Sequence, residues 1–290
     1  MEQFKEYLKN KNYRSRTIRI YTDTLKHFKQ WTEAENIPIK QIRYPDLLAY
    51  INILIDKGNQ DKTINTKLRA ITIYYDMLKI KGEIKNNPAE TLRIKNITRK
   101  IPHDLLNKKT TEKIYKEYPE TTINEKRDKL ILSLITYQAL TTGDISKLEI
   151  RNINLEKAKI YIPQNGRNNS RTLNLKAFQI IPIQIYINKI RPEILKITNK
   201  QSDQLFISSG TSNNMENTYM AIRKKLKQQH PEFKDFKQIR ASIISQMLKH
   251  KNIREVQYMA GHRYVSSTER YLINNIEDLK KQVNKYHPLQ

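Results

Sequence analysis

The sequence contains no cysteine, and it has far fewer acidic than basic residues. Without cysteine, disulfide bonds and thiolate zinc sites are excluded, and a reducing compartment such as the cytoplasm is expected. The six histidines show no spacing typical of a metal site, so we expect neither a metal ion nor another cofactor. No run of about eighteen apolar residues is present, which argues against a membrane-spanning helix. The charged opening MEQFKEYLKN argues against a signal peptide.

Basic residues are the most prominent feature of the composition. Lys and Arg number 54 against 29 for Asp and Glu, which leaves a formal net charge of +25. Such a chain is attracted to polyanions, and with a membrane disfavoured the expected partner is nucleic acid. The length of 290 residues leaves room for two hydrophobic cores. Composition alone is equally compatible with a basic helical protein that coats nucleic acid.

Residues 1–90 carry apolar side chains at alternating steps of three and four, the period of amphipathic helices. Ser15 is a candidate N-cap for the first of these helices. Its buried stripe is expected to comprise Ile18, Tyr21, Leu25 and Phe28. Two further helices are expected, one from Pro45 to Ile55 and one that carries apolar residues from Ile64 to Leu78 and ends before Gly82.

A boundary follows these helices. Asn86-Asn87-Pro88 ends the third helix, and residues 91–105 are basic with little periodicity. We therefore predict a helical domain over residues 1–90, a linker over residues 91–105 and a second domain over residues 106–290.

The second domain is predicted to combine helices with a small sheet. Helices are expected from Glu125 to Leu140 and from Asp144 to Leu148. AKIYIP and RTLNL alternate with a period of two on either side of the polar turn QNGRNNS, which predicts a β-hairpin. LFISS is a candidate for another short strand. The C-terminal third is helical again and ends with one apolar stripe, Leu272, Ile276, Leu279 and Val283.

GHRYVSSTERYL places His262 nine residues before Tyr271. A tyrosine phenol that attacks a DNA phosphate forms a phosphodiester that a DNA hydroxyl can reverse, so no ATP is needed. Arginines are the expected stabilisers of the charge that attack creates, and histidine or lysine can donate hydrogen bonds or protons. Taken alone the spacing is a weak signal, because a single tyrosine on a helix usually has a structural role.

FKQIRASIISQML, residues 236–248, lies upstream of that segment. Together the two resemble the second signature box of the tyrosine recombinase (phage integrase) family. The resemblance implies catalytic roles for Arg240 and His262, with Tyr271 as nucleophile and no metal ion.

The resemblance extends over the whole chain. TIRIYTDTLKHFKQW and KTINTKLRAITIYYDML resemble the family's helical, SAM-like core-binding domain, and ALTTGDISKLEIRNINLEKAKIYIP resembles the start of its catalytic domain. The implied fold is mainly α with a small antiparallel β-sheet, in which a core-binding domain and an α+β catalytic domain form a C-shaped clamp on duplex DNA.

Three positions depart from the family pattern. Thr141 stands where the first catalytic arginine is usual, and losing one such stabiliser typically costs about a hundredfold to a thousandfold in rate. Gly166-Arg167 stands where the hairpin usually carries a lysine, and Arg167 is a cation but a poorer proton donor. Lys237, three residues before Arg240, stands where histidine is most frequent, and it can still donate to a phosphate oxygen.

Other basic residues are candidates for supporting roles. Those that could supply the charge missing at Thr141 are Arg151, Arg167, Arg171 or an arginine of a neighbouring subunit. Those expected to contact the DNA backbone, with solvated surface charge as the alternative for each, are Arg19, Lys62, Lys67, Arg69 and Arg171.

The resemblance implies a site-specific recombinase that works through a 3′-phosphotyrosine at Tyr271. It further implies a homotetramer on duplex DNA with inverted half-sites. The segment from Ile276 to Val283 is expected to pack on its own catalytic domain or on a neighbouring protomer. Three alternatives are a DNA-binding relative weakened in catalysis by Thr141, a topoisomerase-like enzyme and a basic coat protein.

Overall fold

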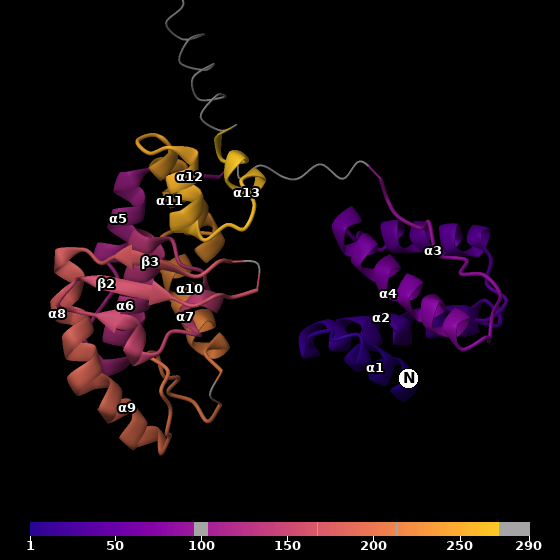
Figure 1. Cartoon of the computed structure of the whole chain (residues 1–290), viewed down its shortest axis with the longest axis horizontal. Coiled ribbons are helices and arrows are strands. Elements are labelled where there is room, and N and C mark those ends of the chain that lie inside the picture. Colours follow the sequence, from indigo (N-terminus) through magenta and orange to yellow (C-terminus); the bar gives the residue numbers. More distant parts are fainter. Residues whose placement is uncertain (96–103, 167, 213, 273–290) are drawn as a thin grey trace, which may run out of the picture. The chain divides into compact units, whose positions relative to one another are not determined.

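The computed structural model describes residues 1–95, 104–166, 168–212 and 214–272. The chain divides into two compact units, Met1–Arg99 and Lys100–Gln290, which are shown in Figure 1. Each unit has its own hydrophobic core.

The N-terminal unit is helical. Its described helices are α1 (Glu2–Asn10), α2 (Ser15–Ala34), α3 (Tyr44–Asp56) and α4 (Asp61–Ile80). The helices expected at residues 45–55 and 64–78 are confirmed as α3 and α4. Gly82 follows α4 with a φ of +71°, a left-handed conformation that glycine adopts without strain and that ends helices.

The start of this unit differs from the expectation. A separate helix, α1, precedes α2, and Ser15 is the first residue of α2 rather than its N-cap, which is Arg14. Helix α1 buries only Phe4 and Leu8, and two buried anchors are too few to display a helical period.

Aromatic side chains hold α2, α3 and α4 together. The Phe28 ring on α2 lies 5.1 Å from that of Tyr50 on α3 and 6.3 Å from that of Tyr75 on α4, measured between centroids. The Tyr75 hydroxyl donates to the carbonyl oxygen of Ile39 at 2.8 Å, so its polar end is satisfied inside the core. Leu25 and Phe28 of the expected stripe are fully buried. The apolar period thus identified the core face correctly.

The C-terminal unit surrounds a buried central helix, α6, with other helices and a small sheet (Figure 1). Its described elements are α5 (Lys108–Lys116), α6 (Ile123–Gln138), α7 (Thr142–Ile145), the 3₁₀ turn η1 (Ile150–Asn152), β1 (Ile153–Asn154), β2 (Lys159–Ile162), β3 (Arg171–Asn174), α8 (Ala177–Ile185), the π-helical turn η2 (Tyr186–Ile190), α9 (Arg191–Thr198), α10 (Glu216–Gln229), α11 (Phe236–Leu248), α12 (Ile253–Ala260) and α13 (Ser266–Glu269). A mainly α fold with a small antiparallel sheet is therefore confirmed.

The sheet has the order β1-β2-β3 and is antiparallel throughout. The predicted hairpin is confirmed, with Ile162 of β2 opposite Arg171 of β3. The expected strand at residues 205–209 is wrong, because that stretch is a buried loop whose Leu205 amide donates to the Leu148 carbonyl oxygen at 2.7 Å. A short apolar run signals burial, and burial alone does not distinguish a strand from a loop that crosses the core.

The elements that carry the predicted catalytic residues pack at one end of this unit. Helix α11 packs against α5, α6 and α12, and α12 packs in turn against β3 and α13. This packing brings together residues that lie far apart in the sequence.

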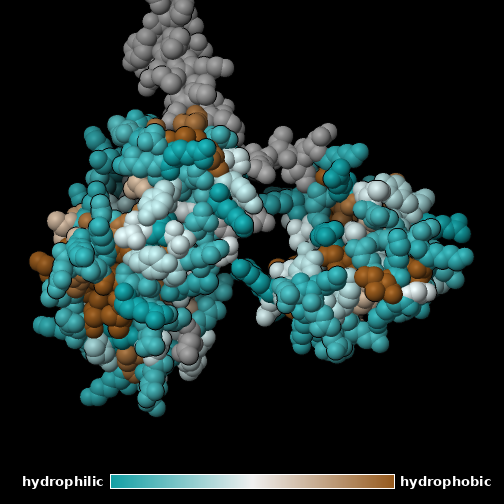
Figure 2. Space-filling model, viewed as in Figure 1, coloured by the Kyte–Doolittle hydropathy of each residue, from teal (hydrophilic) through white to brown (hydrophobic). Residues whose placement is uncertain are grey.

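The visible face in Figure 2 is mostly hydrophilic, in keeping with the composition. One apolar exception lies on α8, where Phe178, Ile181 and Ile185 are exposed. Among the described residues, no helix combines the length and apolarity that a membrane crossing requires.

Candidate active site

Arg240 lies on α11 and is almost completely buried, with 8% of its surface exposed. Asp235 fixes the start of this helix by accepting the Gln238 amide at 2.8 Å. The Arg240 guanidinium donates through Nη1 to the Ala139 carbonyl and through Nη2 to that of Ala260, at 2.6 Å for the second. Ala139 adopts a left-handed conformation at the end of α6, with a φ of +52°. This turn directs its carbonyl oxygen toward Arg240.

Gly261 places His262 beside Arg240. Helix α12 ends at Gly261, whose φ of +70° reverses the chain after the Ala260 carbonyl. His262 Nε2 then lies 3.3 Å from Arg240 Nη2, and Nδ1 lies 2.9 Å from the hydroxyl of Thr268. A guanidinium can only donate, so Nε2 accepts and Nδ1 carries the proton that binds Thr268. Thr268 is fully buried and thereby orients the ring.

Tyr271 lies next to this pair within the same chain. Its ring is nearly parallel to that of His262, with an interplanar angle of 8° and centroids 6.2 Å apart. Tyr271 is partly buried and packs against the catalytic core. Arg240, His262 and Tyr271 are thus brought together, although they lie on α11, after α12 and after α13 respectively.

A buried ion pair supports the cluster from behind. Arg171 Nη2 lies 3.1 Å from Asp144 Oδ2, and neither side chain is exposed to solvent. Arg171 also donates to the carbonyl oxygens of Met259 at 2.9 Å and Asn169 at 3.2 Å. A Cβ placed on Gly261 would lie 2.4 Å from Arg171 Nη1, so any larger residue here would displace this guanidinium.

Asp144 holds its charge inside this network. Burial raises the pKa of Asp144, but the Arg171 charge and the hydrogen bonds from Thr141 and Asn168 outweigh burial and keep the pKa below its ordinary value. Asp144 therefore connects α7, the hairpin turn and β3 as an ionised carboxylate at neutral pH.

Thr141 is the N-cap of α7. Its hydroxyl accepts a hydrogen bond from the Asp144 amide at 3.0 Å. Thr141 lies two residues after Ala139, whose carbonyl oxygen binds Arg240. The position belongs to the site, but it contributes a neutral group. Arg151, proposed from the sequence as a replacement, is 81% exposed at its side chain and pairs with Glu149 on the surface. It is not part of the cluster.

Two further residues were predicted to be catalytic, Lys237 and Arg167, and no contact between them and the cluster is described. Lys237 lies three residues before Arg240 on α11 and is exposed. Arg167 lies outside the described residues. The closing pair of its turn, Asn165 and Asn168, is described, and Asn168 forms a bridge with His262. The hairpin turn therefore adjoins the site.

The residues predicted to contact DNA fall into two groups. Arg19, Lys62 and Arg69 are exposed on the N-terminal unit, and their contact with DNA stays a prediction. Lys67 is half-buried and donates to the Asn59 side chain at 2.9 Å. Arg171, in contrast, has no exposed side-chain surface, so the structure does not support a direct DNA contact for it.

His262 is held neutral. Burial, followed by the positive charges of Arg240, Arg270 and Arg171, lowers its pKa from 6.5 to about 4. Arg240 itself remains protonated, although burial and the Arg171 charge lower its pKa to about 10. At neutral pH the site therefore combines one buried positive charge with an imidazole that can accept a proton.

The low pKa of His262 predicts a pH-dependent stability. Between the folded pKa of about 4 and the ordinary value of 6.5, the unfolded chain binds the proton more tightly, so the free energy of unfolding falls as pH falls. The slope from this one group is at most about 1.4 kcal/mol per pH unit. In His262→Gln this contribution to the pH slope should vanish. The difference in free energy of unfolding between the unaltered chain and the variant should therefore shrink as pH falls. Urea denaturation at several pH values measures it, and a difference that does not vary with pH contradicts the assignment.

Several residues of the site escaped the sequence analysis. Asp144, Thr268 and the carbonyl oxygens of Ala139 and Ala260 contact the cluster but belong to no recognisable spacing. Asp144 stands in the polar stretch TTGDISK, and its role is not visible there because its partner Arg171 is 27 residues away.

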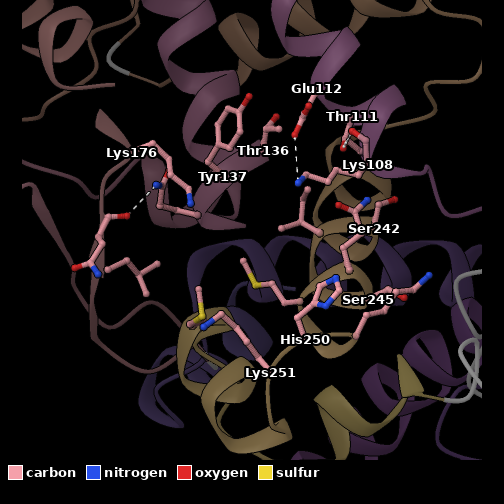
Figure 3. A pocket seen from close by; sticks show the side chains of 18 of the residues that line it. Lys108, Thr111, Glu112, Thr136, Tyr137, Lys176, Ser242, Ser245, His250 and Lys251 are labelled. Carbon is pink, nitrogen blue, oxygen red and sulfur yellow. Dashed lines mark hydrogen bonds and ion pairs between the residues drawn. The ribbon is translucent and has the colours of Figure 1, made fainter. Parts of the chain in front are cut away.

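A hollow of about 950 Å³ lies in the same unit (Figure 3). It is bounded by α5 and the end of α6, by β3, and by α11 and α12. Its apolar lining includes Leu173, Leu175, Ile243, Met247 and Met259. Exposed lysines stand at its edges, namely Lys108, Lys176, Lys249 and Lys251.

Comparison with protein families gives two matches that together span most of the chain. The sequence model of the Phage integrase family matches residues 104–277, and that of the phage integrase N-terminal SAM-like domain matches residues 1–82.

Similar proteins have been named in distant organisms. The chain is 21% identical to the tyrosine recombinase XerC of Oceanobacillus iheyensis over 298 residues, which covers 99% of this chain and 95% of that protein. It is 26% identical to the tyrosine recombinase XerA of Pyrococcus furiosus over 296 residues, covering 100% and 94%.

Solved structures show the same fold. A XerH site-specific recombinase bound to a palindromic difH substrate, in a post-cleavage complex, superposes with a TM-score of 0.74 at 17% identity, covering 92% of this chain and 78% of that one. A lambda integrase fragment bound as a dimer to a COC′ core site superposes with a TM-score of 0.69 at 14% identity, covering 93% of each chain.

Proposed function

The chain belongs to the phage integrase family of tyrosine recombinases, enzymes that cut and rejoin DNA, and we propose that Tyr271 is its nucleophile. The substrate is duplex DNA, and the product of cleavage is a 3′-phosphotyrosine with a free 5′ hydroxyl. The observation that carries this proposal is the convergence of Arg240, His262 and Tyr271 within one protomer.

Each group has a defined part in the proposed reaction. The Tyr271 oxygen forms a bond to phosphorus while its phenolic proton passes to His262 Nε2, whose lone pair is released as Arg240 Nη2 transfers its hydrogen bond to the phosphate. The bond from phosphorus to the 5′ oxygen breaks, and that oxygen leaves with a proton donated by Lys237 or by water. Arg240 donates hydrogen bonds to the non-bridging oxygens, where negative charge increases. Arg167 adds positive charge from the hairpin turn.

The test is a DNA duplex with a nick close to the cleavage point, so that the short fragment diffuses away after cleavage. A protein–DNA band that survives denaturant is expected, with a footprint confined to inverted half-sites. Tight binding without the band supports the relative that has lost the chemistry. Relaxation of a single supercoiled duplex without strand exchange supports a topoisomerase. Binding without sequence preference and with steep salt dependence supports a coat protein.

The family resemblance further supports a homotetramer on two DNA sites, with the two units of each protomer clamped on the duplex. We extend the proposal to the segment from Ile276 to Val283, which lies outside the described residues. The apolar lining of the hollow matches an apolar stripe, and Lys176 and Lys249 complement Glu277 and Asp278 in that segment. The other two lysines of the hollow, Lys108 and Lys251, pair with Glu112 and Glu255. Docking into the hollow of a neighbouring protomer would link the subunits.

The substitution Leu279→Asp tests this docking. It should reduce assembly on DNA to complexes of fewer protomers, because a charge replaces an apolar contact, while binding to an isolated half-site is unchanged. Gln282→Asp, which adds the same charge off the apolar stripe, should assemble normally. Sedimentation of the complexes gives their mass. Equal masses for the two variants and the unaltered chain would exclude the docking.

A further inference from the structure

The proposed active site is short of positive charge. Attack by Tyr271 places additional negative charge on the phosphate, and Thr141 offers a neutral hydroxyl that already accepts the Asp144 amide. Within the described cluster, Arg240 is one buried cation with access to the phosphate. A single arginine stabilises the negative charge of a pentacoordinate phosphate only in part.

Two candidates from the sequence do not supply the missing charge, and a third, Arg167, lies outside the described residues and stands where the family carries its hairpin lysine rather than its first arginine. The three donor nitrogens of Arg171 are each engaged by Asp144, Met259 or Asn169, and its side chain is fully buried. Arg151 is exposed on the surface and paired with Glu149.

Arg270 has the properties that these two lack. It directly precedes Tyr271, and its Nε atom is buried without a hydrogen-bond partner among the described residues. An unpaired guanidinium nitrogen inside a protein is costly unless a ligand completes it. The Arg270 charge also reaches His262, where it helps to lower the pKa of the imidazole.

The neighbouring arginine of the same segment shows the contrast. Arg263 is exposed, and its guanidinium lies over the Tyr264 ring at 5.8 Å from the centroid. Arg263 therefore faces outward with a local partner, whereas Arg270, next to the nucleophile, has a buried nitrogen that no described residue binds.

We propose that Arg270 contacts the phosphate under attack and supplies the positive charge that Thr141 does not. The inference rests on the proposed function, because it needs the phosphate bound between Arg240, His262 and Tyr271. The role is specific to this chain, since it arises from the neutral residue at position 141.

The nicked duplex provides the test. Arg270→Met keeps the aliphatic stem and removes the charge, and it should slow formation of the covalent complex by about a hundredfold to a thousandfold with DNA binding retained. Arg270→Lys should lose less, because the charge stays while the fork-shaped donor set is lost. Arg263→Met is the matched control and should cleave at the rate of the unaltered chain.

A second substitution distinguishes a chemical role from a structural one. Adding Thr141→Arg to Arg270→Met should restore much of the lost rate, because it returns a guanidinium to the position where the family carries one. A purely structural Arg270 would not be rescued in this way. If Arg270→Met cleaves as fast as the unaltered chain, or if Thr141→Arg leaves the slow rate unchanged, Arg270 does not supply the charge that Thr141 lacks. If the unaltered chain forms no covalent complex at all, the proposed function itself fails.

Discussion

Replacing Tyr271 by phenylalanine is expected to abolish the covalent protein–DNA complex and leave DNA binding unchanged. The substitution removes one oxygen and keeps the ring, so the near-parallel contact with His262 and the packing on the core remain. The neighbouring hydroxyl of Thr268 is not positioned to replace it, because that group is buried and bound to His262 Nδ1. The loss should therefore be complete rather than graded, as expected for the atom that forms the covalent bond.

Tyr264→Phe is the matched control for this prediction. Tyr264 lies in the same segment and is 61% exposed, so loss of its hydroxyl should affect neither binding nor cleavage. Gel electrophoresis under denaturing conditions measures the covalent complex, and a mobility shift under native conditions measures binding. A covalent band that persists in Tyr271→Phe would assign the nucleophile to another residue.

The substitution Asp144→Asn is expected to have the largest effect on stability. It preserves size and most hydrogen bonds but leaves the Arg171 charge buried without a counter-ion. Breaking a buried ion pair in this way typically costs about 3–5 kcal/mol of the free energy of unfolding. Because Arg171 also binds the Met259 carbonyl near the end of α12, the turn that carries His262 should loosen, and cleavage should slow as well.

Asp23→Asn is the control for this loss. Asp23 pairs with Arg19 at 4.0 Å on the surface, and both side chains are more than half exposed. Exposed pairs of this kind contribute less than about 1 kcal/mol, so the variant should unfold almost as the unaltered chain does. Urea denaturation gives both values. A loss at Asp144 no greater than that at Asp23 would show that Arg171 finds another partner or solvent.

The free energy of unfolding should also decrease at acidic pH because of Asp144. The Arg171 charge and hydrogen bonds hold the carboxyl pKa below its ordinary value in the folded state. Its contribution is thus complete at neutral pH and is lost as pH falls through the folded pKa. The acid dependence from Asp144 therefore adds to that from His262, and both weaken the fold as pH decreases.

Local signals in the sequence predicted much of this protein. Helices α3, α4 and α6 follow from their apolar period, and the hairpin of β2 and β3 follows from a period of two around a polar turn. Family membership follows from two adjacent segments that carry Arg240, His262 and Tyr271 in order. These features depend on residues that are neighbours along the chain or on one helical face, so their spacing is visible without a structure.

Other features were missed because their partners are distant in sequence. Helix α1 has too few buried anchors to show a period, and the apolar run at 205–209 is a loop that only the surrounding core makes buried. The Asp144–Arg171 pair and the two carbonyl oxygens that bind Arg240 join segments far apart along the chain.

The sequence by itself determined the family, the hairpin, helices α3, α4 and α6, the positive charge and the identity of the nucleophile proposed here. Only the tertiary structure decided which charges reach the site, because burial and pairing depend on packing between elements. It assigned Arg171 to an internal ion pair and placed Arg151 on the surface. Beside Tyr271, it left a buried nitrogen of Arg270 without a hydrogen bond to any described residue. The three residues are all arginines with the same side-chain chemistry. Their different electrostatic roles are set by the local dielectric and by the partners that the fold provides.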